Sequence, residues 1–255
     1  MNFKQGKLNT LAAAALGALA LMSAAPAMAD VINFESVGPG IYGGGETFTD
    51  AGYTLSVIDS PAGAAGFAGA VLDGTDPNAC DVAACPTGNS SFYYAGLNDG
   101  SLKIQRADNT QFRISGLDYG FLAPVGNLDP FSYGQLTVVG TKSDGGILSF
   151  AYDFPVLSQG ASPFVSLSLL NDFGSATLSS LTIGSCLFDG NGGCFSVLSG
   201  AENLGQFALD NLQVSTVPEP ETYAMLGLGL GLVGWMSRRR SKADQAAAAV
   251  AVTTA

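Results

Sequence analysis

The chain has 255 residues, of which 47% are apolar and only 12% are charged, and it contains no histidine. Without an imidazole, Ser-His-Asp and Cys-His catalytic groups and most zinc or copper sites are excluded. The formal net charge of −11, from 10 basic and 21 acidic residues, argues against a nucleic-acid partner, because phosphate binding needs clustered Lys and Arg.

The first 29 residues have the pattern of a secretory signal peptide. Two lysines precede an apolar run from Leu11 to Met22, and Ala27-Met28-Ala29 forms an A-x-A cleavage site. A permanent anchor would need about 20 apolar residues to cross the bilayer, and this run is shorter. We therefore expect export, cleavage after Ala29 and a mature chain that begins at Asp30.

Three parts follow one another in a fixed order near the C-terminus. They are the tripeptide Pro218-Glu219-Pro220, an apolar stretch from Tyr223 to Met236, and the cluster Arg238-Arg239-Arg240. Arginines that follow an apolar stretch stay on the cytoplasmic side of a membrane. A helix of this length rises only about 21 Å, less than the roughly 30 Å of the hydrocarbon core. We therefore expect one C-terminal hydrophobic helix that anchors the chain in the membrane only transiently.

This order, over residues 218–240, resembles the PEP-CTERM sorting signal of Gram-negative bacteria. The resemblance implies processing by exosortase, a membrane protease, and an association with exopolysaccharide and biofilm. One departure is the Ala-rich extension at residues 241–255, which we expect to be a disordered tail, because such signals usually end at the arginines. The alternative is an ordinary C-terminal anchor beside a chance Pro-Glu-Pro.

Residues 30–217 form the predicted passenger domain, which holds 18 acidic and four basic residues. Glycine-rich clusters separate short runs of aromatic and β-branched residues, and no internal stretch keeps a helical period. The runs that we predict to be strands are residues 54–58, 102–106, 111–115, 135–140, 147–152, 164–170, 176–183 and 206–214. Residues 63–74 are predicted to be a long loop and residues 142–146 a hairpin turn. The pattern predicts a single all-β domain, an antiparallel β-sandwich of jelly-roll or Greek-key type.

Four cysteines occur in two close pairs, Cys80 with Cys85 and Cys186 with Cys194. An oxidising compartment predicts two disulfides, for which three pairings exist. We favour the two local bridges, each of which stabilises the fold by about 2 to 2.5 kcal/mol by closing a short loop. The alternative is a zinc site, but neither spacing is C-x₂-C and no histidine completes a ligand set.

Acidic residues near both ends of the passenger form a candidate metal site. Asn33-Phe34-Glu35 opens the domain and residues 206–212 close it, and strand alternation places Asp210 on the face opposite Phe207. An early Phe-Glu with a late apolar-Asp-Asn resembles jelly-roll carbohydrate-binding modules, and the closing segment fits the QFxxD motif of a PEP-CTERM protein family. The resemblance implies Glu35 and Asp210 as ligands of a structural Ca²⁺. The alternative is that Asp210 accepts hydrogen bonds from neighbouring backbone amides, and no other cofactor is expected.

The passenger offers little for catalysis. Glycoside hydrolysis needs two carboxyl groups about 5 to 9.5 Å apart, and Glu35, Glu46 and Glu202 have no local motif that groups them. We therefore expect no catalytic residues and no enzyme activity.

Sugar binding without catalysis would use aromatic faces. Since the only Trp lies in the C-terminal segment, the candidates in the passenger are Tyr93, Tyr94 and Tyr119. Alternation along a strand is expected to turn at least one of Tyr93 and Tyr94 outward. The alternative is that these rings pack in the core.

Together these patterns predict a non-catalytic exported protein. Exosortase would sort it from an inner-membrane intermediate to the cell surface or extracellular matrix, where it is associated with exopolysaccharide or biofilm. One alternative is a carbohydrate-binding module with a specific glycan ligand, and the next is a glycoside hydrolase.

Overall fold

The computed structural model describes residues 29–62, 66–80, 83–217, 225, 227–236 and 238. Residues 29–217 form one compact unit, and residues 1–28 and 218–255 are grouped in another. The predicted signal peptide, apart from Ala29, and the tail at residues 241–255 lie outside the described residues.

The described part of the domain contains fourteen β-strands. Their bounds are β1 (Ala29–Ile32), β2 (Gly40–Gly43), β3 (Thr47–Asp50), β4 (Tyr53–Ile58), β5 (Phe67–Asp73), β6 (Phe92–Gly96), β7 (Ser101–Arg106), β8 (Phe112–Phe121), β9 (Gly134–Lys142), β10 (Ile147–Asp153), β11 (Val165–Ser168), β12 (Leu178–Phe188), β13 (Cys194–Phe195) and β14 (Phe207–Thr216). Each of the eight predicted runs coincides with one of these strands, and the predicted hairpin turn joins β9 to β10.

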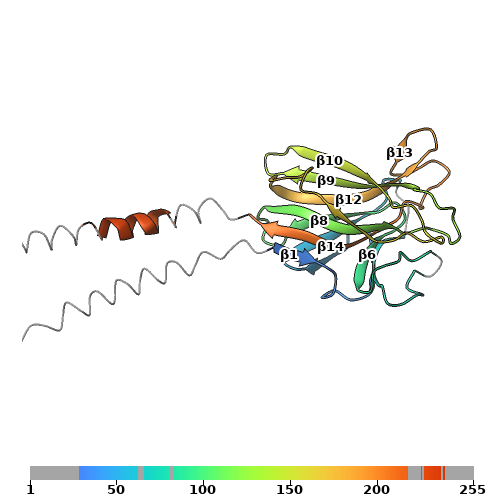
Figure 1. Cartoon of the computed structure of the whole chain (residues 1–255), viewed down its shortest axis with the longest axis horizontal. Helices are drawn as coiled ribbons and strands as arrows, with labels where there is room; N and C mark the ends of the chain where they lie inside the picture. The colour runs from blue at the N-terminus through green and yellow to red at the C-terminus, as the bar shows by residue number, and fades with distance from the viewer. Residues whose placement is uncertain are drawn as a thin grey trace, which may run out of the picture. The chain divides into compact units, whose positions relative to one another are not determined.

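The strands form two layers of antiparallel sheet. The hydrogen-bonded order is β2-β5-β6-β14-β8-β12-β7-β4-β3, and the step from β8 to β12 consists of a single pair, Phe112 with Leu178. The first layer therefore contains β2, β5, β6, β14 and β8, with β1 on β14 and β11 on β8. The second contains β3, β4, β7, β12, β9 and β10, with β13 on β12. Figure 1 shows β10, β9 and β12 side by side above β8, β14 and β1. The predicted all-β sandwich is confirmed.

Alternating burial along the strands produces the core between the layers. In β4, Tyr53, Leu55 and Val57 are buried, whereas the two residues between them are partly exposed. In β14, Phe207 and Leu209 face the same core, and a register shift after Asp210 lets Leu212 and Val214 continue it. Because β14 lies between β8 on one side and β6 and β1 on the other, it is the central strand of the first layer.

The loop predicted at residues 63–74 is wrong for its second half, where Phe67–Asp73 forms β5. Small residues make this strand possible, because β5 passes directly over a tyrosine ring. A Cβ atom on Gly69 would lie 2.3 Å from the hydroxyl oxygen of Tyr94. The Ala/Gly composition that suggested a loop therefore meets a packing requirement of a buried strand.

Candidate functional site

Both ends of the domain's chain lie at one end of the sandwich, here called the termini end. Ala29 of β1 pairs with Ser215 of β14, so the first and last strands start and finish together. β14 ends at Thr216, which pairs with Phe112, and the backbone N–H of Val217 donates to the carbonyl oxygen of Gln111 (3.3 Å). The compact domain therefore ends at Val217, immediately before the Pro-Glu-Pro tripeptide in the sequence.

Most of the predicted sorting residues lie outside the described residues, namely Pro218, Glu219, Pro220, Arg239 and Arg240. Arg238 is described, and it is helical together with residues 225 and 227–236. Among the residues that the structure describes, no helix combines the length and the apolar character needed to cross a membrane.

The termini end also collects most of the positive charge of the domain. Arg113 is paired across the sheet with Ser215, and Lys142 with Leu178, the partner of Phe112. Arg106 ends β7 and forms an ion pair with Asp108 (2.7 Å) in the turn that precedes β8. The fourth basic residue, Lys103, lies further along β7.

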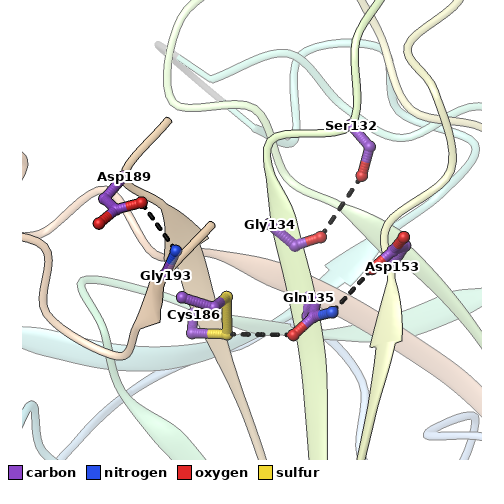
Figure 2. Close-up of a disulfide and its surroundings, with 8 residues drawn as sticks. Ser132, Gly134, Gln135, Asp153, Cys186, Asp189 and Gly193 are labelled. Atoms are coloured by element: carbon purple, nitrogen blue, oxygen red, sulfur yellow. Dashed lines mark hydrogen bonds between the residues drawn. A yellow bond between two sulfur atoms is a disulfide. The ribbon is translucent and has the colours of Figure 1, made fainter. Parts of the chain in front are cut away.

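The cysteines form the two local bridges that the spacing favoured, Cys80–Cys85 and Cys186–Cys194. The second closes the turn between β12 and β13. In Figure 2, the side chain of Cys186 lies beside Gln135 of β9, and Asp189 accepts a hydrogen bond from the backbone N–H of Gly193 (2.9 Å). The first pins the segment between β5 and β6 against the outer face of the first layer, because the hydroxyl of Tyr93 lies 3.3 Å from the Cys80 sulfur.

The predicted glycan-binding tyrosines are buried, although alternation does turn one of Tyr93 and Tyr94 to the outer face of the sheet. Tyr94 is 0% exposed, Tyr93 1% and Tyr119 7%. Tyr94 faces the core between the layers, as alternation requires. Tyr93 faces outward from the sheet, but Cys80, Ala83 and Phe164 cover that face and form a second, smaller apolar cluster with it. Burial raises the pKa of Tyr93 to about 12. None of these rings offers an open face to a sugar.

Asp210 lies on the same outer face, buried under the same segment. Its Oδ2 accepts hydrogen bonds from Asn89 Nδ2 (2.6 Å) and Ser91 Oγ (2.9 Å), and its Oδ1 accepts one from the backbone N–H of Asn211 (2.7 Å). The first two donors arrive from a segment about 120 positions away, which sequence reasoning did not anticipate. The pKa of Asp210 is raised chiefly by burial, against the lowering effect of these hydrogen bonds.

A second carboxylate stands beside Asp210. Asp118 of β8 is its cross-strand partner, and its Oδ2 accepts a hydrogen bond from Asn211 Nδ2 (2.9 Å), while its Oδ1 accepts one from Ser166 Oγ (2.5 Å). The amide of Asn211 therefore links the two acids.

Glu35, the other predicted calcium ligand, accepts a hydrogen bond at Oε1 from the backbone N–H of Phe92 (2.9 Å), one residue after Ser91. Glu35 and Asp210 thus contact the same short segment, residues 89–92. Within the described ranges, no group of three or more Asp, Glu, Cys or His side chains is placed to hold a metal ion. Calcium binding by Glu35 and Asp210 stays a prediction.

A cavity of about 500 Å³ opens next to this network. Three loops surround it: the segment between β5 and β6, the loop after β8 and the loop after β10. Its lining includes Asp76, Thr87, Asn89, Asn127 and Gln159, with Pro77, Pro86 and Tyr93 as the larger apolar surfaces. The loops after β8 and β10 lie at the end of the sandwich opposite the termini end, which we call the loop end. No sequence motif indicated this cavity.

Comparison with known proteins identifies one segment of the chain. No curated protein matches the chain. Solved structures with a similar chain trace include TmCBM61 in complex with beta-1,4-galactotriose, at 9% identity, covering 64% of this chain and 88% of that chain, with a TM-score of 0.31. A family 11 carbohydrate-binding module from Clostridium thermocellum, in complex with a beta-1,3-1,4-mixed-linked tetrasaccharide, matches at 12% identity, 76% and 99% coverage and a TM-score of 0.26. An exo-beta-agarase matches at 12% identity, 75% and 25% coverage and a TM-score of 0.34.

At these identities and TM-scores, the structural similarities carry no information on function. The family model is different, because it matches a defined segment. The matched segment begins at Thr216, the last residue of the central strand β14. Residues 216–240 are the PEP-CTERM protein-sorting motif, which indicates an exported protein that is sorted to the cell surface.

Proposed function

We propose that this protein is an exosortase substrate. Its signal peptide directs export, and the C-terminal segment holds the chain at the inner membrane. Exosortase then removes that segment and leaves the β-sandwich at the cell surface or in the extracellular polysaccharide matrix. The observation that carries the proposal is the match of residues 216–240 to the sorting motif.

The construction of the domain supports removal of the C-terminal segment. Central strand β14 contributes Phe207, Leu209, Leu212 and Val214 to the core, and it is complete at Thr216. The last backbone hydrogen bond of the domain is made by Val217. A cut after Val217 would therefore cost the sandwich none of its described core contacts, whereas a cut within β14 would remove a central strand.

We propose a non-catalytic role for the released domain. The absence of histidine leaves carboxylates as the main candidates for acid–base chemistry. Asp210, a buried carboxylate that stands opposite a second acid, accepts hydrogen bonds through both of its oxygens. A hydrolase, the less favoured function, would release reducing ends from bacterial exopolysaccharide, and we expect no such release.

Fractionation of the native host and of an exosortase deletion strain tests the proposal. In the wild-type strain we expect the domain outside the inner membrane, and in the deletion strain we expect full-length chain in the inner membrane. The variant Pro218→Ala/Glu219→Ala/Pro220→Ala should behave in the wild-type strain as the unmodified protein behaves in the deletion strain. Glu221→Ala, a change in the same segment outside the tripeptide, is the matched control and should be sorted normally. Normal sorting of the triple variant would contradict the proposal.

We further propose association with exopolysaccharide, and the alternative of a specific carbohydrate-binding module has one structural feature in its favour. That feature is the cavity at the three loops rather than the predicted tyrosines.

A further inference from the structure

The cavity between the segment joining β5 to β6, the loop after β8 and the loop after β10 has the properties of a small-molecule site. Its volume, about 500 Å³, lies within the range of roughly 300 to 1,000 Å³ that is typical of ligand pockets. We infer that this cavity binds uncharged, hydroxyl-rich ligands, the neutral sugar units of an extracellular polysaccharide. The inference deepens the proposed function and rests on it in one respect: the polysaccharide is available as a ligand only if the protein is sorted to the cell surface or matrix.

The walls of the cavity are held in place by the fold. Isolated β-bridges join Ala84 to Ala123 and Thr87 to Pro163, so the segment between β5 and β6 is hydrogen-bonded to both neighbouring loops. The disulfide Cys80–Cys85 closes the same segment on the side of Tyr93. Ordering a loop on binding costs free energy and lowers the affinity for the ligand. A pocket with fixed walls avoids this cost.

Two of the loops also touch each other directly. A Cβ atom on Gly160 would lie 3.0 Å from the backbone nitrogen of Asn127, and Gly160 has a φ of 80°. One residue of each loop at this contact, Asn127 (φ 60°) and Gln159 (φ 54°), adopts the left-handed conformation. This conformation is uncommon for residues other than glycine. This conformation sets the direction in which both side chains leave the backbone, and both line the cavity.

The polar groups of the lining suit hydroxyl groups better than anionic ligands. The side-chain amides of Asn127 and Gln159 are exposed at the cavity, and each offers both a donor and an acceptor to a ligand. None of the four basic residues of the domain lines the cavity, and three of them lie at the termini end. An anionic ligand would meet the carboxylate of Asp76 with no cation to balance it. Among sugars, neutral units therefore fit the cavity better than uronates, with Pro77 as the exposed apolar residue of the lining.

An array of neutral hexose and N-acetylhexosamine oligosaccharides, with oligogalacturonate and alginate fragments on the same array, tests the inference on the purified exported protein. We expect binding to neutral oligosaccharides and none to the uronates. The variant Asn127→Gly/Gln159→Gly removes both amides while permitting the left-handed backbone. The loss of two hydrogen bonds should weaken binding by about tenfold or more. Asn109→Gly is the matched control, because Asn109 also has a φ of 60° but lies in the turn before β8, and it should bind as the wild type does.

Three results would overturn the inference: no binding to any neutral oligosaccharide, stronger binding to uronates, or equal affinity of the double variant and wild type. Circular dichroism of each variant confirms that a lost signal is not lost folding. The binding assay uses protein in solution and does not depend on cellular sorting. If the binding assay fails while fractionation is normal, the pocket is rejected and the sorting proposal stands. If binding is as expected while fractionation is abnormal, the sorting proposal is rejected and the pocket stands.

Discussion

The two ends of the sandwich differ in what they contain. At the termini end, β1 is paired with β14 up to Ala29, and β14 is paired with β8 up to Thr216. Three of the four basic side chains of the domain are collected there, and the sorting motif begins there. The loop end contains long connections, the Cys186–Cys194 bridge and one side of the cavity. One end is built from regular strand pairing and the other from loops fixed by covalent and side-chain contacts.

This difference matches two separate requirements. The attachment to the sorting motif needs a strand that is complete where the motif begins, and β14 meets that requirement. A binding surface needs irregular backbone that presents polar groups, and the loops meet that requirement because rigid strands hold them. Substitutions at the two ends should therefore affect different properties of the protein.

The largest effect is expected from Leu212→Ala in the half of β14 nearest the termini end. Leu212 is fully buried and pairs with Ile32 of β1. Truncation of a buried leucine costs about 2 to 5 kcal/mol of unfolding free energy, measurable by urea denaturation. Val125→Ala, at an exposed position in the loop after β8, is the control and should change stability by less than about 0.5 kcal/mol. An equal loss of unfolding free energy in the two variants would contradict the difference between the termini end and the loop end.

A smaller loss is expected from Cys80→Ser/Cys85→Ser. The short loop that this bridge closes contributes about 2 kcal/mol through the entropy of the unfolded chain. The bridge also covers Tyr93, so limited proteolysis should cut within residues 83–91 faster than in the wild type. Cys186→Ser/Cys194→Ser should lose similar stability without faster cleavage in that segment. Cleavage at residues 83–91 in both variants would show that the first bridge has no local role.

A gain of about 1 kcal/mol is expected from Tyr94→Phe, because a buried hydroxyl without a partner destabilises the folded state. The hydroxyl of Tyr94 is buried and has no hydrogen-bond partner among the described residues. In Tyr93→Phe the contact with the Cys80 sulfur is lost, so no such gain is expected. Urea denaturation of both variants tests the difference, and destabilisation by Tyr94→Phe would contradict it.

The pH dependence of the unfolding free energy should show the titration of Asp210. The pKa of Asp210 is raised in the folded protein, chiefly by burial, and Asp118 is the charged group that faces it. A carboxyl with a raised pKa stabilises the fold below its unfolded-state pKa, and this contribution is lost as pH rises through the folded-state pKa. From about pH 4 to about pH 7, the wild type should therefore lose stability relative to Asp210→Asn. Urea denaturation across this range measures the slope, and a difference between the two proteins that is independent of pH would contradict the account.

The same samples test the predicted calcium ligands. A structural Ca²⁺ held by Glu35 and Asp210 predicts that EGTA lowers the melting temperature of the wild type. It also predicts that Asp210→Asn no longer responds to EGTA. An unchanged melting temperature in the wild type would reject the ion and leave the hydrogen bonds of Asp210 as its stabilising contacts.

The strands could be predicted wherever local pattern decides structure. Period-2 alternation in β4 and β9 follows directly from one buried and one more open face. β5 was missed because its glycine at position 69 packs against Tyr94, a partner that is distant in sequence. Alternation predicted that one of Tyr93 and Tyr94 turns outward, as Tyr93 does, but it cannot predict the loop that covers that face.

The sorting motif and the cavity also differ in whether local sequence could predict them. The sorting motif is contiguous, so three adjoining segments of sequence were enough to predict it. The cavity is assembled from residues 76, 127 and 159 on three loops, and no local pattern links them. The partners of Asp210, Asn89 and Ser91, were missed for the same reason.

Mass spectrometry of the C-terminus of the extracellular protein tests the central claim most directly. The account predicts chains that keep β14 through Thr216 and lack the apolar stretch and the arginines at residues 238–240. Extracellular chains that still carry residues 223–240, or full-length chains found solely in the inner membrane of the native host, would contradict it.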